Sequence, residues 1–163
     1  MQLSETIENI YGWFSGFHND AIGKALEVFT NPDTGDVIWT SKYPLMMLVT
    51  AIIAFVIAFA YYIWPIDHPK FKSWWSWLIM LVVNCGLSLL AGWHLAHVRM
   101  KLVLEHRESW EEITGRASHV NADTFDCLGM GLSNMMIGVL IFIFFSLILT
   151  FFSTNAKYSP FTK

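Results

Sequence analysis

Three long runs of the sequence contain no charged residue. They cover residues 43–66, 73–98 and 127–156. A helix needs about 20 apolar residues to cross a hydrocarbon core about 30 Å thick, because it rises about 1.5 Å per residue. Each run is long enough, so the pattern predicts an all-α integral membrane protein with three transmembrane helices. The predicted spans are 44–65, 74–98 and 131–153.

Aromatic residues mark the connection between the first two spans. Tyr61 and Tyr62 lie near the end of the first span, and Trp74 opens the second. Tyrosine and tryptophan favour the membrane–water interface. We therefore expect residues 66–73 to form a short loop, and the first two spans to form a helical hairpin.

Residues 1–43 show helical periodicity in two short segments. The apolar positions of these segments are Leu3, Ile7, Ile10, Tyr11 and Phe14, followed by Ile22, Ala25, Leu26 and Phe29. This spacing predicts two short amphipathic helices, and residues 31–35 form a turn after them. Their polar faces are acidic, whereas helices that lie on membrane surfaces usually carry lysine and arginine. We therefore favour docking of these helices on protein.

The second helix is expected to continue beyond the membrane. No helix breaker occurs between Val98 and Ile113, and Lys101 and Glu105 are opposite charges four residues apart. The pattern predicts a helical stalk, followed by a loop, within residues 99–130.

Charge is distributed unequally between the two sides of the membrane. With three spans, residues 1–43 and 99–130 share one side and carry twelve acidic and six basic residues, a net charge of −6. Residues 66–73 share the other side with the tail, 154–163, and the net charge there is +3. The acidic side argues against direct binding of nucleic acid, which needs clustered lysine and arginine.

Orientation does not follow from the basic residues, because six on the acidic side face four on the other. The first 42 residues are polar and do not resemble a signal peptide, so we expect the N-terminus to stay in the cytoplasm. The expected location is a plasma membrane or a bacterial inner membrane, with lipids as partners.

The predicted spans contain no charged residue, although 14% of the chain is charged. Charges inside the membrane are typical of proton relays, ion-coupled transporters and voltage sensors, so these classes are disfavoured. Small and weakly polar residues instead recur on one face of each helix. In the second and third helices these are Asn84, Ser88, Ala91, Gly131, Asn134 and Gly138.

Two functions are compatible with these small-residue faces. They allow close helix packing, or they line a water-filled path in an oligomer. The first hypothesis is a small oligomeric channel or pore-forming subunit, gated through its acidic side. The alternative is a non-catalytic accessory or anchor subunit of a multi-subunit membrane complex of the respiratory or secretion type. Either requires a homo-oligomer or other membrane subunits.

The remaining candidate chemistry is sparse. His94 and His97 lie on one face near the end of the second span, where they could bind a ligand or form hydrogen bonds. Haem held by two histidines would need a second chain, because the first and third spans contain none. Cys85 and Cys127 form no metal-binding or disulfide pattern. We expect no enzyme activity, no metal site and no cofactor.

Overall fold

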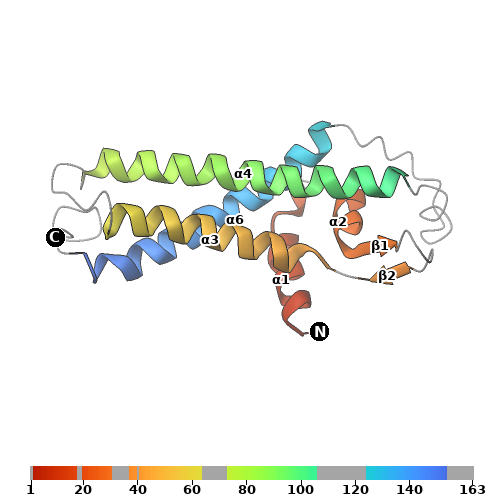
Figure 1. Ribbon diagram of the computed structural model, residues 1–163, viewed down its shortest axis with the longest axis horizontal. Helices are drawn as coiled ribbons and strands as arrows, with labels where there is room; N and C mark the ends of the chain where they lie inside the picture. The colour runs from red at the N-terminus through yellow and green to blue at the C-terminus, as the bar shows by residue number, and fades with distance from the viewer. Residues whose placement is uncertain are drawn as a thin grey trace. The chain divides into compact units, whose positions relative to one another are not determined.

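A computed structural model describes residues 2–17, 20–30, 37–39, 41–63, 73–105 and 124–153. Helices make up most of this part of the chain (Figure 1). In chain order the elements are α1 (Gln2–Gly12), η1 (Ser15–Phe17), α2 (Asp20–Glu27), β1 (Val28–Thr30), β2 (Val37–Trp39), α3 (Tyr43–Tyr62), α4 (Trp74–Glu105) and α6 (Thr124–Thr150).

Three helices are long and apolar enough to cross a membrane. The stretches that meet this requirement are Tyr43–Tyr62 in α3, Trp74–Leu102 in α4 and Cys127–Thr150 in α6. A membrane protein with three helices of spanning length and composition is therefore confirmed.

The ends of these helices refine the predicted boundaries. α6 begins at Thr124 rather than at Gly131. α4 continues past Val98 to Glu105. The rest of the predicted stalk and loop, most of residues 66–73 and the tail 154–163 lie outside the described residues.

Two compact units divide the chain. Unit 1 comprises residues 1–47 and 89–134, and unit 2 comprises residues 48–88 and 135–163. The boundaries fall within α3, α4 and α6, so each of these helices contributes to both units.

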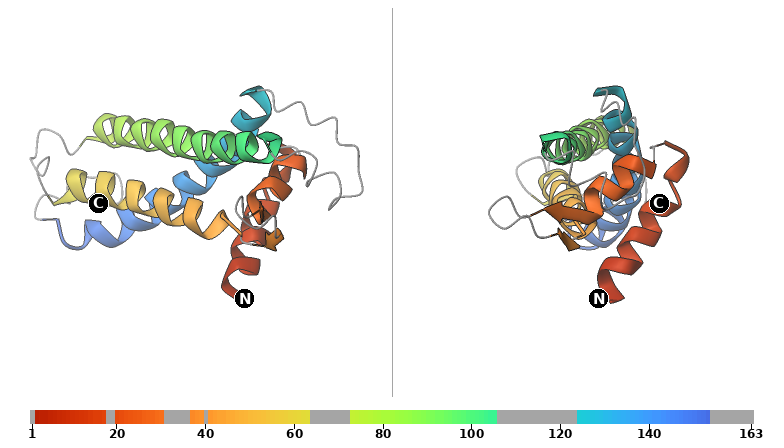
Figure 2. Two further views of the ribbon diagram at one scale, coloured as in Figure 1. Left: turned by 45° about the vertical axis from the view of Figure 1, so that its right-hand side comes forward. Right: turned by 90° about the vertical axis from the view of Figure 1, so that its right-hand side faces the viewer.

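In unit 1 the N-terminal helices pack through the apolar face that the sequence predicts. Ile22, Ala25 and Leu26 of α2 are almost completely buried. The backbone amide of Lys42 donates to the carbonyl of Leu26 at 2.8 Å and so ties the start of α3 to the end of α2. Figure 2 shows these elements from two further sides.

A small antiparallel sheet, which the sequence analysis does not predict, also belongs to unit 1. β1 pairs with β2 in the register Val28–Trp39, Phe29–Ile38 and Thr30–Val37. The predicted turn at residues 31–35 lies outside the described residues. The strands on either side of it explain how the chain returns from α2 towards α3.

Unit 2 has a core of aromatic and small residues. Its most deeply buried members are Ala54, Ala58, Tyr61, Tyr62 and Phe142. Alanine lets the helices approach, and the rings fill the space between them.

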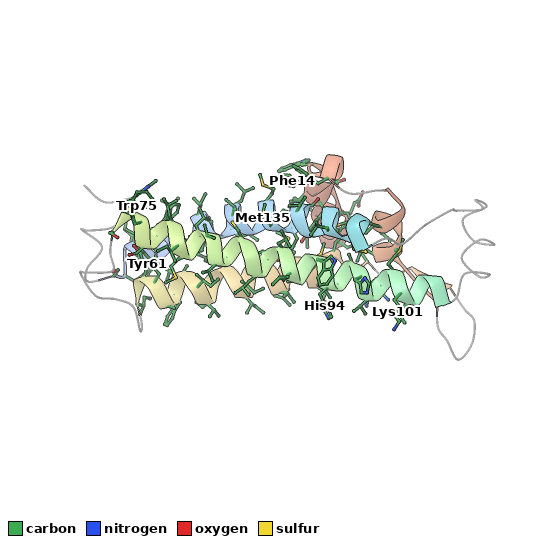
Figure 3. All side chains as sticks on the ribbon, turned by 90° about the horizontal axis from the view of Figure 1, so that it is seen from above. Phe14, Tyr61, Trp75, His94, Lys101 and Met135 are labelled. Atoms are coloured by element: carbon green, nitrogen blue, oxygen red, sulfur yellow. The ribbon has the colours of Figure 1, made fainter. Side chains whose placement is uncertain are left out.

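Aromatic residues at this end of the helices take two different positions. Tyr61 and Tyr62 are fully buried, so their rings pack inside the protein. Trp74 and Trp75 are exposed, as expected of interface residues. Figure 3 shows Tyr61 turned towards the helices and Trp75 projecting outwards.

Candidate functional site

A buried tyrosine connects α1 to α6 in unit 1. The Tyr11 hydroxyl donates to Oδ1 of Asn134 at 2.6 Å, and both side chains are almost completely buried. The Tyr11 ring lies 5.0 Å from the ring of Tyr43, which belongs to α3. Burial raises the pKa of the Tyr11 phenol above its usual value of 10.0, and Tyr43 raises it further. Tyr11 is therefore a neutral donor at physiological pH.

Ser133 forms a second connection between the same two segments. Its Oγ lies 3.1 Å from the carbonyl oxygen of Phe14 and 3.2 Å from that of Gly129, one turn earlier in α6. The single hydroxyl proton can be donated to either carbonyl. Adjacent residues of α6, Ser133 and Asn134, thus both hold the segment that contains α1.

Two glycines allow α4 and α6 to approach closely in unit 1. A Cβ atom added to Gly92 would lie 2.6 Å from Cβ of Asn134. A Cβ atom added to Gly131 would lie 2.8 Å from the backbone oxygen of Leu89. Neither separation is sterically tolerable, so both positions require glycine in this packing. Of these two, only Gly131 is predicted from the sequence.

A related arrangement joins α4 and α6 in unit 2. Nδ2 of Asn84 donates to the carbonyl oxygen of Gly138 at 3.0 Å. A Cβ atom added to Gly138 would lie 2.5 Å from Oγ of Ser88 and 3.3 Å from a methyl carbon of Thr50. The structure thus brings together three of the predicted residues, Asn84, Ser88 and Gly138.

Sequence reasoning missed a third polar contact, also in unit 2. Nε1 of Trp77 donates to Oγ of Ser146 at 3.5 Å, and Oγ1 of Thr150 donates to the carbonyl oxygen of Ser146 at 2.7 Å. Trp77 is buried, unlike its neighbours Trp74 and Trp75. The four-residue spacing of Ser146 and Thr150 is the signal that could have indicated a polar face on α6.

The outward faces of the three helices have the opposite character. The exposed positions over residues 45–59 of α3, 79–90 of α4 and 136–148 of α6 are Leu45, Leu48, Ile52, Phe55, Val56, Phe59, Ile79, Val82, Val83, Gly86, Leu87, Leu90, Met136, Leu140, Phe144, Leu147 and Ile148. All are apolar or glycine. Over residues 45–59 of α3, 79–90 of α4 and 136–148 of α6, the polar side chains are therefore buried or half-buried.

The candidate histidines lie elsewhere. His94 and His97 are exposed on α4, and the His97 ring stacks on Trp93 with 5.8 Å between centroids. Ala91 is half-buried. The described residues contain no group of three or more histidine, cysteine or carboxylate side chains that could hold a metal ion. Of the two cysteines, Cys127 is buried and Cys85 is half-buried, and neither forms a disulfide bond.

Arg99 is a buried cation that the sequence analysis assigned to the region outside the membrane. It is about nine-tenths buried in unit 1 and shares a buried face of α4 with Gly92 and Ala96. Removing its guanidinium from water carries a desolvation cost.

Comparisons of the chain with protein families, curated proteins and solved structures found no match. The arrangement must therefore be interpreted from its own chemistry. It consists of neutral hydrogen-bonding groups and glycines that hold helices together within one chain. Such groups orient helices and exclude lipid between them.

Proposed function

We propose that the protein is a non-catalytic accessory or anchor subunit of a larger membrane complex. The distribution of polar side chains carries this proposal, because over residues 45–59 of α3, 79–90 of α4 and 136–148 of α6 the polar side chains are buried or half-buried, while the exposed positions are apolar or glycine. Ion paths are lined mainly by polar groups, carbonyls or charged rings. A homomeric ring of these helices would offer few such groups to a shared axis, which makes the channel hypothesis the weaker of the two.

The surface of α4 is the best candidate for contact with a partner helix. Only 17% of its most apolar stretch is buried, compared with 39% in α3 and in α6. Gly86 lies in the middle of this exposed surface, and a Cβ atom there would meet nothing within 4 Å. Small residues at such positions let two helices pack closely. We propose that a transmembrane helix of another subunit packs against Val82, Gly86 and Leu90.

The acidic side of the protein supplies a second docking region. A net charge of −6 over residues 1–43 and 99–130 suits a protein partner with a basic surface better than nucleic acid or anionic lipid. The predicted continuation of α4 as a stalk would carry part of this charge away from the bilayer. A cytoplasmic position for this side remains part of the proposal.

Purification from the native membrane tests the subunit hypothesis. The tagged chain is extracted in a mild detergent, and the mass of the intact assembly is measured. We expect other chains in a fixed ratio, and no ion flux when the purified chain alone is placed in liposomes. A ring of this chain alone that conducts ions would overturn the proposal in favour of the channel.

A pair of variants tests the proposed contact on α4. Gly86→Leu adds a side chain at an open, exposed position, so it should leave the stability of the isolated chain nearly unchanged and should reduce recovery of the partner. Val56→Leu is the control, because it enlarges an exposed residue of α3. Equal recovery of the partner with both variants would exclude the α4 surface as the interface.

A further inference from the structure

Within unit 1, α1 runs across the direction of the second half of α4. In the right-hand view of Figure 2, α4 points towards the viewer, whereas α1 extends across the picture. A helix that is transverse to a membrane-spanning helix lies in the plane of the bilayer. The orientation of α1 is therefore that of an in-plane helix.

Contacts within unit 1 give the depth of α1. Asn134, which binds the Tyr11 hydroxyl, lies directly beside Gly92 of α4. His94 lies about 3 Å further along α4, since two residues rise by that amount. The exposed surface of α4 is apolar up to Leu90 and becomes mixed from His94, with His97 and Lys101 beside Val98 and Leu102, as expected where hydrocarbon gives way to headgroups. The end of α1 is therefore at the membrane boundary.

Figure 3 is consistent with this depth. Phe14, which follows α1, lies at nearly the same level along α4 as His94, and Lys101 lies further towards the C-terminal end of α4. The carbonyl of Phe14 is held by Ser133, next to Asn134 in α6. Both contacts thus hold this segment at the boundary.

The residues of α1 divide into three sectors. Ile7 and Tyr11 form the buried line that faces the protein. At 100° per residue, Ile10 lies about 100° from Tyr11 on one side, and Glu8 and Glu5 lie about 60° and 120° from it on the other. One edge of the helix is therefore apolar and the opposite edge is acidic.

Large aromatic side chains are exposed just beyond the end of α1. Trp13 is 76% exposed and Phe17 is 50% exposed. Aromatic residues at the level of the headgroups are common membrane anchors, whereas exposure of both rings to water would be unfavourable. The acidic edge would repel anionic headgroups, so the apolar and aromatic edge must provide any attraction to the bilayer.

We propose that α1 and η1 form an interfacial anchor that lies in the membrane plane. Ile10, Trp13 and Phe17 insert between the headgroups and the acyl chains of a zwitterionic phospholipid bilayer, and Glu5 faces water. The sequence favours docking of this helix on protein, and Ile7 and Tyr11 do dock on protein. The proposal adds the lipid contact and does not depend on any partner subunit.

Spin-label accessibility tests this arrangement in phosphatidylcholine vesicles that contain only this chain. Both native cysteines are replaced by serine, and single cysteines for a nitroxide label are introduced by Trp13→Cys, Phe17→Cys and Glu5→Cys. Collisions with oxygen report lipid, and collisions with a water-soluble nickel chelate report water. We expect labels at Trp13 and Phe17 to favour oxygen and the label at Glu5 to favour nickel, at low and at high salt.

Reference labels at exposed positions of α4 calibrate the scale. Leu90→Cys reports the hydrocarbon and Lys101→Cys reports water. The proposal is wrong if the labels at Trp13 and Phe17 are as accessible to nickel as the label at Lys101. It is also wrong if both labels exclude oxygen and nickel together, because a second protein surface would then cover them. Loss of the oxygen preference at high salt would exclude insertion through apolar contacts.

Discussion

At the residue scale, a few buried polar groups determine how the helices meet. Tyr11 donates to Asn134 in unit 1, and Asn84 donates to the carbonyl of Gly138 in unit 2. Away from water, a donor or acceptor that loses its partner cannot exchange it for a solvent molecule. These contacts therefore specify one arrangement of the helices within each unit, although each adds only a modest free energy.

Tyr11→Phe should lower the free energy of unfolding by about 1 to 3 kcal/mol, because Oδ1 of Asn134 would stay buried without its donor. Unfolding in detergent measures the loss. The Tyr11→Phe/Asn134→Ala pair should lose less than the sum of the two single variants, because each single change already breaks the same hydrogen bond. Strict additivity would mean that the hydrogen bond does not contribute to stability. Trp13→Phe, at an exposed position, is the control for a change of ring in the same segment.

Replacing two glycines of α4 and α6 by alanine should have different effects on the free energy of unfolding. Gly131→Ala forces a methyl group against the backbone oxygen of Leu89 and should destabilise by about 1 to 3 kcal/mol. Gly86→Ala meets open space and should be neutral, or more stable by up to about 1 kcal/mol, since alanine restricts the unfolded chain. Thermal unfolding of the two purified variants measures both effects. Equal shifts in their unfolding temperatures would contradict the close approach of the helices.

The buried phenol of Tyr11 should make stability depend on alkaline pH. Its pKa is raised in the folded state, so the proton is held more tightly there than in the unfolded chain. The resulting stability is complete below the unfolded pKa of about 10 and is lost as the pH rises above that value. The free energy of unfolding should fall above pH 10 more steeply in the wild type than in Tyr11→Phe. Parallel pH profiles would show that Tyr11 does not titrate differently in the two states.

At the element scale, the start of α4 is fixed by a serine cap. The backbone amide of Ser76 donates to Oγ of Ser73 at 3.3 Å, and the two hydroxyl groups lie 3.0 Å apart. Ser73→Ala should cost about 0.5 to 2 kcal/mol and increase amide hydrogen exchange over the first turn of α4. Ser73→Asp should retain the cap. If the amide hydrogens of the first turn of α4 exchange at the same rate in Ser73→Ala and Ser73→Asp, the side chain of residue 73 does not stabilise this helix end.

Sequence reasoning succeeds for the elements whose signal is long. The three runs without charge predict three helices because the thickness of the bilayer imposes a length that few other structures need. The strands β1 and β2 have three residues each, too few for an alternating pattern to be distinguished from a helix end or a loop. Tertiary pairing with each other, rather than local preference, determines that they are strands.

The same limit applies to the candidate site. Periodicity places Asn84 and Ser88 on one face and Asn134 and Gly138 on another, but it does not indicate which helix each face meets. Gly92 is missed because a single glycine carries no periodicity. Trp77 is missed because a tryptophan at the start of a span resembles an interface residue, as its exposed neighbour Trp75 does.

At the scale of the whole molecule, three spans predict that Ser15 and Ser159 lie on opposite sides of the membrane. A cysteine at Ser15 or Lys101 should react with an impermeant thiol reagent from one side, and a cysteine at Ser159 from the other, once Cys85 and Cys127 are replaced by serine. Intact cells expose one side of the membrane to the reagent, and inverted vesicles expose the other. We expect the cysteines at Ser15 and Lys101 to be on the cytoplasmic side. Labelling of Ser15 and Ser159 from the same side would exclude an odd number of crossings.

The bond between Tyr11 and Asn134 also has a consequence for biosynthesis. Its partners are separated by 123 positions, so α1 leaves the ribosome long before α6 exists. At roughly 5 to 20 residues per second, the wait is on the order of 6 to 25 seconds. During that interval the apolar face of α1 has no α6 to cover it. Docking of α1 is therefore a late event, which can occur only after the last helix has been synthesised.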